Sequence, residues 1–312
     1  MTALVNDTPF LTRLGWRAEA LAWDAYEAWY KAKGIDAASD AAGALLRKLG
    51  PMTPVHEVAR INMQRCFPEA AKPELDRLLG AMWESFGRLI GEMPHLSVFA
   101  GPEFDDRVEF IGRERLEAAR DAGEALVIIS MHHSNWEVAA AAISQTGLPC
   151  HITYRAANNP LIDQRISATR KGYGVKTLTA KGGDGAKALM QALKAGESVA
   201  LMNDQKMNDG VEAPFFGHPS MTAPGPTRLA MRHGVKLVPL SVRRLGGVKF
   251  RVEAHEPIAL SDDPDKSAAI IETVTRINQW VESEIRQAPE QWFWVHRRWA
   301  KSVYKQARQS KA

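Results

Sequence analysis

The chain has 312 residues, of which 45% are hydrophobic and 24% charged, and its formal net charge is +4. This length and composition suit one large α/β domain, or a core with a smaller helical part, and they exclude a mainly disordered chain. The basic excess is small, so it favours acidic partners such as phosphorylated lipids or an acidic carrier protein and does not indicate nucleic acid.

The cysteine content and the hydropathy restrict the cellular compartment and the relation to membranes. Only Cys66 and Cys150 are present, which implies no disulfide framework and favours the cytoplasm. No segment reaches the roughly eighteen apolar residues of a membrane span, and the N-terminus lacks the pattern of a signal peptide. If the protein works on a lipid, we expect it to do so from the membrane surface.

Four helical patterns open the chain and predict an all-helical N-terminal region over residues 1–100, followed by an α/β domain over residues 101–312. They cover residues 10–33, 37–49, 54–66 and 73–93. The first is dense in aromatic residues and leucines among charges, which suits an interfacial helix at the lipid headgroup boundary. A helix that packs these side chains on the domain core fits the same pattern equally well.

From residue 108 onward, strand and helix patterns alternate, which predicts a mostly parallel mixed sheet flanked by helices. Helices are expected at residues 113–122, 160–172, 185–194, 224–233 and 267–286. A further helix is expected to follow the strand at 126–129 and to run to about residue 145. Strands are expected at residues 108–111, 126–129, 150–155, 175–179, 198–203, 236–243 and 249–256, the last two joined by a turn at Gly246-Gly247.

The second of these strands ends at a histidine-rich loop. His132 follows the apolar run 126–129, at the sheet edge where ligands bind in open α/β folds. Ser134 followed three residues later by Glu137 forms a capping box, which predicts a helix start with Glu137 turned back toward the loop. We therefore expect Glu137 to accept a hydrogen bond from one imidazole nitrogen of His132, leaving the other as a general base.

The same residues also fit a purely structural role, because Ser-x-x-Glu is common as plain helix capping. A metal site fits less well, since the motif lacks the i, i+4 histidine pair of a zinc site and neither cysteine has further ligand-like neighbours. The motif alone leaves catalysis and capping open, and it predicts no metal or other cofactor.

Further polar clusters fall at predicted strand ends on the same side as His132. Tyr154-Arg155 closes one strand and Asn158-Asn159-Pro160 opens the next helix, while Asn203-Asp204-Gln205-Lys206 closes another strand. Charged groups gathered at one edge of a sheet seldom come from core packing, so a shared active site is expected there.

Several ordered blocks within residues 105–300 resemble one known family. They are His132-x4-Glu137, Tyr154-Arg155 with Asn159-Pro160-Leu161, Asp204-Gln205 with Ala213-Pro214-Phe215-Phe216-Gly217, Val238-Pro239-Leu240, and Pro289-Glu290-Gln291-Trp292-x-Trp294-x-His296-Arg297-Arg298-Trp299. Together they resemble the lipid A biosynthesis acyltransferases, the late lauroyl and myristoyl transferases of Gram-negative bacteria, within the wider lysophospholipid and glycerolipid acyltransferase group. The chain departs from that family in two features: a charged, Trp-rich stretch replaces the usual initial membrane-spanning helix, and the acid of the HX4D/E element is a glutamate.

The resemblance implies an O-acyltransferase that moves a fatty acyl chain from an acyl carrier protein thioester to a hydroxyl of a lipid A precursor or related glycolipid. It implies a peripheral protein on the cytoplasmic face of the inner membrane. The chemistry of the motif agrees, because an alcohol is a poor nucleophile at neutral pH and needs a base such as His132 to take its proton. Arg155, or backbone amides at the start of the helix, would stabilise the oxyanion.

Other residues are expected to bind substrate. A guanidinium binds phosphate well, so Arg155 also suits an acceptor phosphate. By the resemblance, Asp204 belongs to the site and holds either Arg155 or the acceptor sugar. Asn159, Lys206 and Arg228 are weaker substrate-binding candidates. A turn residue is the structural alternative for Asp204, and a solvated helix position is the alternative for Arg228.

Three groups of residues are candidates for binding the acyl chain, the carrier and the membrane. Phe215, Phe216 and Met221 would wall an apolar acyl slot, although ordinary core packing explains them equally well. The tail 297–311, with nearby tryptophans at 292, 294 and 299, is typical of a membrane-surface element. Five basic residues would meet an acidic carrier protein or anionic headgroups, unless they form a solvated face: Arg165, Arg170, Lys171, Lys176 and Lys181.

Three other functions stay open at this point. The acceptor could be another bacterial lipid, or water could replace the alcohol and make the protein a hydrolase. The protein could also be a non-catalytic lipid-binding or carrier-binding module in which His132 and Glu137 only cap a helix. The chain has no Gly-x-Ser-x-Gly elbow, which disfavours a serine route.

Overall fold

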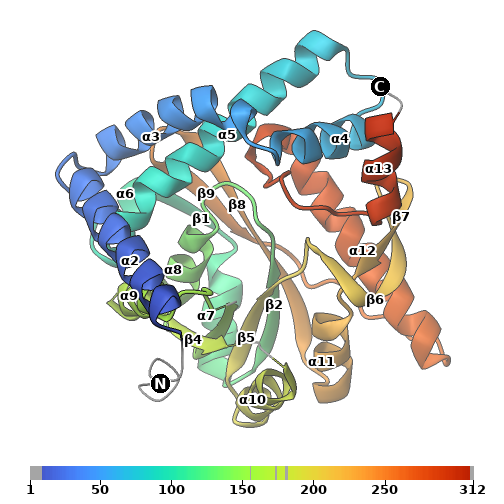
Figure 1. Cartoon of the computed structure of the whole chain (residues 1–312). Helices are drawn as coiled ribbons and strands as arrows, with labels where there is room; N and C mark the ends of the chain where they lie inside the picture. Colours follow the sequence, from blue (N-terminus) through green and yellow to red (C-terminus); the bar gives the residue numbers. More distant parts are fainter. Residues whose placement is uncertain (1–8, 155, 173, 180–181, 310–312) are drawn as a thin grey trace.

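A seven-stranded sheet forms the centre of the computed structural model, which describes residues 9–154, 156–172, 174–179 and 182–309 (Figure 1). Its strands are β1 (Val108–Ile111), β2 (Leu126–Ser130), β3 (Cys150–Tyr154), β4 (Lys176–Thr179), β5 (Ser198–Met202), β8 (Lys236–Gly246) and β9 (Lys249–Ala254). Their order is β1-β9-β8-β2-β5-β3-β4, and in the described part of the sheet only β8 and β9 pair antiparallel. The predicted mostly parallel mixed sheet is therefore confirmed.

Helices cover both faces of this sheet, which explains the continuous apolar run of β2. Val127 and Ile129 pack with α10 (Gly182–Lys194), α11 (Gly225–His233) and α12 (Lys266–Gln287). The intervening β2 side chains, Leu126 and Ile128, pack on the opposite face with α7 (Arg113–Ala122) and α8 (Glu137–Gln145). A strand buried on both faces has no polar alternation, as the sequence of β2 requires.

The N-terminal part is helical, as predicted. It consists of α2 (Phe10–Lys31), α3 (Ile35–Leu49), η1 (Gly50–Met52), α4 (His56–Cys66), α5 (Lys72–Glu92), η2 (Met93–Ala100) and the short α6 (Phe104–Arg107). Residues of α4 and α5 share one hydrophobic core with the sheet and α12. The N-terminal helices thus pack directly on the α/β part. None of the described helices is long and apolar enough to cross a membrane.

The segment after β5 forms an antiparallel hairpin of β6 (Lys206–Phe215) and β7 (His218–Thr222). Its turn contains Phe216 and Gly217, both with positive φ (49° and 72°), so a glycine suits the second position. The hairpin packs against α12. Phe215 is fully buried there, so it belongs to the core and the prediction that it walls an acyl slot is wrong.

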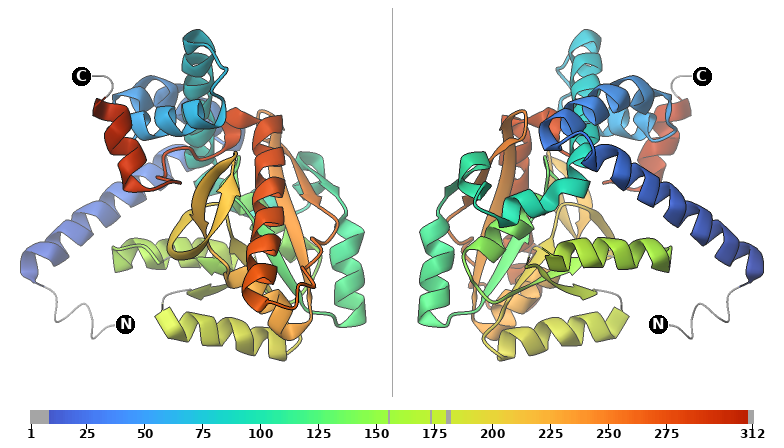
Figure 2. Two further views of the ribbon diagram at one scale, coloured as in Figure 1. Left: turned by 90° about the vertical axis from the view of Figure 1, so that its right-hand side faces the viewer. Right: turned by 90° about the vertical axis from the view of Figure 1, so that its left-hand side faces the viewer.

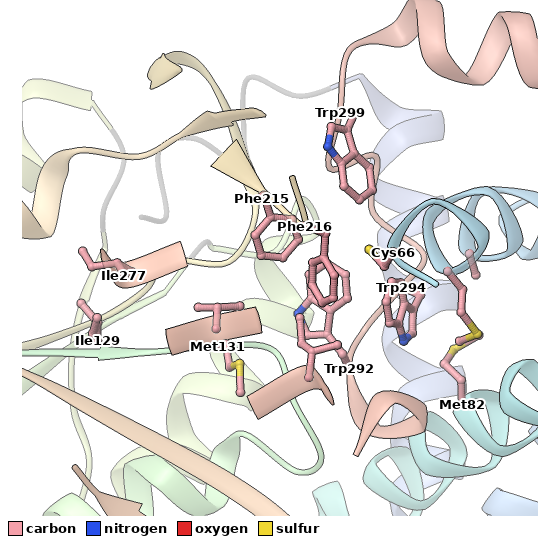
Figure 3. Packing of buried hydrophobic residues seen from close by; sticks show 14 of the residues in the cluster. Cys66, Met82, Ile129, Met131, Phe215, Phe216, Ile277, Trp292, Trp294 and Trp299 are labelled. Atoms are coloured by element: carbon pink, nitrogen blue, oxygen red, sulfur yellow. The ribbon is translucent and has the colours of Figure 1, made fainter. Parts of the chain in front are cut away.

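The Trp-rich segment after α12 is part of the core. Trp292, Trp294 and Trp299 are each at most 4% exposed, and Figure 3 shows Trp292 beside Phe215 and Phe216. The prediction that these tryptophans belong to a membrane-surface element is therefore wrong. After η3 (Pro289–Gln291) and this segment, α13 (Lys301–Gln309) ends the described chain.

Helix α2 has two different faces. Ala20 and Tyr30 are buried toward the protein, whereas five large apolar side chains are more than half exposed: Phe10, Leu11, Leu14, Leu21 and Trp29. Figure 2 shows α2 reaching the periphery of the molecule beside α9 (Pro160–Gly172). One face of α2 therefore packs on the protein, as one of the two sequence expectations had it, and the other presents the apolar surface that an interfacial helix requires.

Candidate active site

The site forms where two neighbouring strands end. His132 follows β2 and Asp204 follows β5, and these strands are parallel neighbours in the sheet. The main-chain N–H of Asn203 donates to the carbonyl oxygen of Ser130 (3.0 Å), which holds the two loops together just past the strands. The carboxyl ends of parallel strands share one edge, so side chains 72 positions apart in sequence meet there.

Asp204 binds His132 through both the ring and the backbone. Its Oδ1 lies 2.8 Å from Nδ1 of the imidazole, and its Oδ2 accepts a hydrogen bond of 2.9 Å from the His132 main-chain N–H. This carboxylate is 2% exposed, whereas the His132 side chain is 22% exposed. The pair therefore directs Nδ1 inward and leaves Nε2 as the ring nitrogen for a substrate.

The electrostatics of the pair favour the ion pair over the neutral forms. Burial alone would raise the pKa of Asp204, but the His132 charge and three hydrogen bonds outweigh it and lower this pKa to about 2. Burial alone would lower the pKa of His132, yet the Asp204 carboxylate raises it above its usual value. Asp204 thus stays ionised at neutral pH and stabilises an imidazolium next to it.

The C-terminal segment holds this pair in place. The indole Nε1 of Trp292 donates to Oδ2 of Asp204 (2.8 Å). Main-chain bonds run from Ser134 N–H to the Gln291 carbonyl (2.7 Å) and from Phe293 N–H to the His132 carbonyl (2.9 Å). Residues 291–293 therefore lie along the histidine loop like an added strand. The Trp-rich block acts inside the site and not at a membrane surface.

Glu137 has a different partner from the predicted one. Its carboxylate, 4% exposed, accepts two hydrogen bonds from Arg170 of α9, from Nε (3.0 Å) and from Nη2 (2.5 Å). The carboxylate that bonds an imidazole nitrogen of His132 is Asp204, at Nδ1, where Glu137 was expected. The expectation that Glu137 orients His132 by a hydrogen bond is thus replaced by the His132–Asp204 pair, and Glu137 orients Arg170.

The capping box is also not formed. The sequence predicted Ser134 as the N-cap with Glu137 in the first turn, but helix α8 begins at Glu137, and its N-cap residue Trp136 provides no side-chain cap. Ser134 has φ 56°, a left-handed conformation, and its main-chain N–H donates to the Gln291 carbonyl. Within the described chain, its buried hydroxyl has no hydrogen-bond partner.

A buried polar network fixes the loop from the opposite side. Glu92 at the end of α5 is fully buried and pairs with Arg244 of β8 through two bonds of 2.6 and 2.9 Å. The amide of Asn135 donates to the same carboxylate (2.8 Å), as does the hydroxyl of Ser39 (2.6 Å). Burying an unpaired charge costs several kcal/mol of folding free energy. Moving Asn135 would remove one of the hydrogen bonds that satisfy the buried Glu92 carboxylate, so the network holds Asn135 in place.

His132 opens into a cavity of about 520 Å³. Its walls come from the histidine loop, α8, β3, α9 and the end of β5 with the loop that follows it, and they combine polar groups with apolar surface. The ring of Trp136 meets the His132 ring edge to face, with centroids 5.1 Å apart. The lining residues include Trp136, Glu137, Ile152, Tyr154, Ile166, Arg170, Met202 and Gln205. Asp204 lies behind His132, so a substrate in this cavity reaches the imidazole and not the carboxylate.

The remaining predicted substrate-binding residues lie apart from the cavity or outside the description. Arg155 lies outside the described residues. The described residues that line the cavity do not include Asn159, Lys206 or Arg228. Asn159 is buried and structural: its amide donates to the Trp16 carbonyl (3.0 Å) and to Glu19 (2.8 Å), which ties α9 to α2. Lys206 begins β6, and Arg228 is exposed on α11.

Most of the basic residues proposed for carrier or headgroup binding are engaged within the protein. Arg165 forms two bonds with Asp24 of α2 (2.6 and 2.7 Å), and Lys176 lies 3.6 Å from Glu197. Arg170 pairs with Glu137 as described. Lys171 is exposed, and Lys181 lies outside the described residues.

Sequence reasoning missed the contribution of Glu92, Asn135, Arg244 and Trp292 to the site. One signal for Glu92 was available: it continues the buried stripe of α5 three residues after Leu89, where a carboxylate needs a partner. Among the described residues, no group of three or more His, Cys, Asp or Glu is placed to hold a metal ion.

Comparison with known proteins gives one consistent family. Residues 28–301 match the family model described as bacterial lipid A biosynthesis acyltransferase. A lipid A biosynthesis acyltransferase of Haemophilus influenzae is 26% identical over 242 residues, covering 76% of this chain and 73% of that protein. The lipid A biosynthesis lauroyltransferase of Escherichia coli is 27% identical over 78% of each chain. A phosphatidylinositol mannoside acyltransferase of Mycobacterium tuberculosis is 30% identical over 59% of this chain and 60% of its own.

Proposed function

This chain belongs to the family of bacterial lipid A biosynthesis acyltransferases, and from that premise we propose that it transfers a fatty acyl chain from an acyl carrier protein thioester to a hydroxyl of a lipid A precursor or related glycolipid. It is an O-acyltransferase, as its relatives are. The observation that carries the proposed mechanism is the His132–Asp204 pair, with the imidazole at the wall of a cavity large enough for substrate.

In this mechanism His132 is the general base. Its Nε2 takes the proton of the acceptor hydroxyl as the oxygen attacks the thioester carbonyl, and the C–O bond forms. The tetrahedral intermediate then collapses, the C–S bond breaks, and the protonated imidazole gives its proton to the departing thiolate. The products are the ester and the free thiol, and no covalent acyl-enzyme forms.

Asp204 is the proposed orienting acid, in place of Glu137. Its hydrogen bond to Nδ1 selects the tautomer with Nε2 free, and its charge stabilises the imidazolium that forms during attack. The indole N–H of Trp292 on the other carboxylate oxygen keeps Asp204 ionised. Glu137 supports the site indirectly, because it holds the Arg170 guanidinium at the cavity wall.

The side-chain amide of Gln205 is the proposed oxyanion donor. Its Nε2 lies 3.3 Å from Nδ1 and 3.5 Å from Nε2 of His132, so the amide lies against the imidazole ring and within reach of an oxyanion formed next to it. A fixed N–H donor at the position where negative charge develops stabilises the transition state more than the ground state. Gln205 lines the cavity, as this role requires.

We also propose that the protein lies on the cytoplasmic face of the inner membrane through α2. The outward residues Leu11, Leu14, Leu21 and Trp29 recur at helical spacing and are between 53% and 78% exposed. A helix with such an apolar face inserts it at the boundary between headgroups and acyl chains. A lipid acceptor in that leaflet would then be delivered beside the site.

Mass spectrometry tests this function directly. Purified protein is incubated with an acyl carrier protein thioester and a lipid A precursor, and the lipid products are analysed. A mass gain of one acyl group on the acceptor is the expected result, and it must disappear in His132→Ala. One relative is named for a phosphatidylinositol mannoside, so that glycolipid serves as the second acceptor in the assay. If it alone is acylated, the proposed acceptor changes and the proposed acyl-transfer mechanism stays.

A further inference from the structure

A second, apolar hollow adjoins the cavity of His132. It has a volume of about 670 Å³ and lies between α2, α5 and α9. Trp23 and Tyr26 contribute from α2, Phe86 and Ile90 from α5, and Ile162 from α9. We call this space the α2 groove.

The α2 groove is a built feature of the fold, because polar contacts attach α2 at both of its rims. On the α9 side, Arg165 forms two bonds with Asp24, and Asn159 donates to Glu19. On the α5 side, the Tyr26 hydroxyl donates to the Ile90 carbonyl (2.5 Å). These bonds hold the helix above apolar walls without filling the space between them.

The groove connects the catalytic cavity to the exposed face of α2. Trp136, Glu137, Ile166 and Arg170 line both spaces, so the inner end of the groove opens beside the reacting centre. At its outer end, Ala22 belongs to the groove wall and is also exposed on the helix. A continuous path therefore runs from α2 to the cavity of His132, with mainly apolar walls in the groove and the Glu137–Arg170 ion pair where the two spaces meet.

We infer that the α2 groove holds a hydrocarbon chain of the lipid acceptor while its hydroxyl reaches His132, an inference that rests on the proposed function. The acceptor is then a glycolipid that already carries acyl chains. Such a molecule keeps its other chains in the bilayer during the reaction, so it needs a groove that is open along the membrane-facing helix. A chain delivered by a water-soluble carrier protein has no need for such an opening.

A groove-filling variant tests the inference. Ala22→Trp places a large ring in the groove, and Ala25→Trp adds the same ring one turn away on the exposed face. We expect Ala22→Trp to raise the KM for the lipid acceptor at least tenfold and to leave the donor KM unchanged. With a deacylated, water-soluble form of the acceptor, both variants should match the wild type. A higher donor KM, or equal behaviour of the two variants toward the lipid, overturns the inference.

Photo-crosslinking provides a readout that does not depend on catalysis. A lipid A precursor with a diazirine in one acyl chain is bound to the wild-type protein, irradiated, and the labelled peptides are mapped. Labels within residues 19–31, 86–93 and 162–170 support the inference. Labels confined to other segments overturn it, whatever the measured rate of acyl transfer. Failure of the proposed function has a different signature, namely a wild-type protein that acylates no lipid.

Discussion

The Nδ1 nitrogen of His132 lies 2.8 Å from Oδ1 of Asp204, although 72 positions separate the two residues in the sequence. The nearer acid, Glu137, is bonded to Arg170 instead.

Replacing His132 with alanine should lower kcat for acyl transfer by roughly 10²–10⁴-fold, the usual contribution of a general base. The measurement is the transfer of a labelled acyl chain at saturating donor and acceptor. His151→Ala is the matched control, because His151 pairs with Glu197 and does not line the cavity. Full activity of His132→Ala in a folded protein would refute the general-base role.

Asp204→Asn should lower kcat by roughly 10²-fold or more, because an amide can hold the ring in the wrong tautomer and does not stabilise the imidazolium. In Glu137→Gln the proposed base and its partner both remain, so a smaller loss, mainly in KM, is expected. Steady-state kinetics of the two variants in parallel decide between the carboxylates. A larger loss of kcat in Glu137→Gln than in Asp204→Asn would mean that Glu137 orients His132.

The pH dependence follows from the raised pKa of His132. A base must be unprotonated, so kcat/KM should rise with pH and reach half its maximum above the usual histidine value of 6.5. Trp292→Phe removes one donor to Asp204, which makes the carboxylate a better acceptor for imidazolium and should move this half-point to higher pH. Profiles from pH 5 to 9 for both proteins provide the check, and a half-point below 6.5 in the wild type would contradict the pairing.

The ion pair also links stability to pH in two windows. The folded pKa of Asp204 is depressed from 3.8 to about 2, so its contribution to the free energy of unfolding is present above pH 3.8 and is lost as pH falls toward 2. The folded pKa of His132 is raised, so its contribution is complete below 6.5 and is lost as pH rises through the folded value. In urea unfolding, the stability difference between wild type and Asp204→Asn should be largest between about pH 4 and 6.5 and should shrink toward both extremes. A difference that stays constant with pH would exclude this linkage.

Removing the Glu137 carboxylate should destabilise the fold. Glu137→Ala removes both hydrogen bonds that the largely buried Arg170 donates to this carboxylate, and breaking such a pair costs about 3 kcal/mol. Glu197→Ala is the control, since Glu197 is 32% exposed and an exposed pair contributes less than about 1 kcal/mol. Denaturant titration measures the free energy of unfolding of both variants. Equal decreases would mean that the buried pair contributes no more to stability than the exposed one.

Two charges on the outer face of α2 should weaken membrane binding. Leu14→Glu with Leu21→Glu removes two inserted leucines, each contributing about 1.5 kcal/mol, so binding to phosphatidylglycerol vesicles should fall by roughly 100-fold. Leu49→Glu with Met52→Glu adds the same charge at exposed apolar positions elsewhere. Vesicle sedimentation compares them. If both double variants bind equally, the surface that contacts the membrane is not α2.

The sequence by itself determined the elements and the edge on which the site lies. Residues 108–111, 113–122 and 160–172 were predicted with the bounds that β1, α7 and α9 have. Their periodicity is a local property, and each helix or strand must bury its own apolar face. The position of His132 just past β2 follows from the same local pattern.

Only the tertiary structure decided which side chains meet at that edge. Asp204 reaches His132 because β5 lies next to β2, and strand order leaves no trace in the local pattern of either strand. Glu137 was expected to bond His132 because it is near in sequence, but the bond that formed depends on where α9 places Arg170. The tryptophans after α12 and the leucines of α2 both stand among charged residues in the sequence. The fold buries these tryptophans and exposes these leucines, because burial depends on the neighbours that packing supplies.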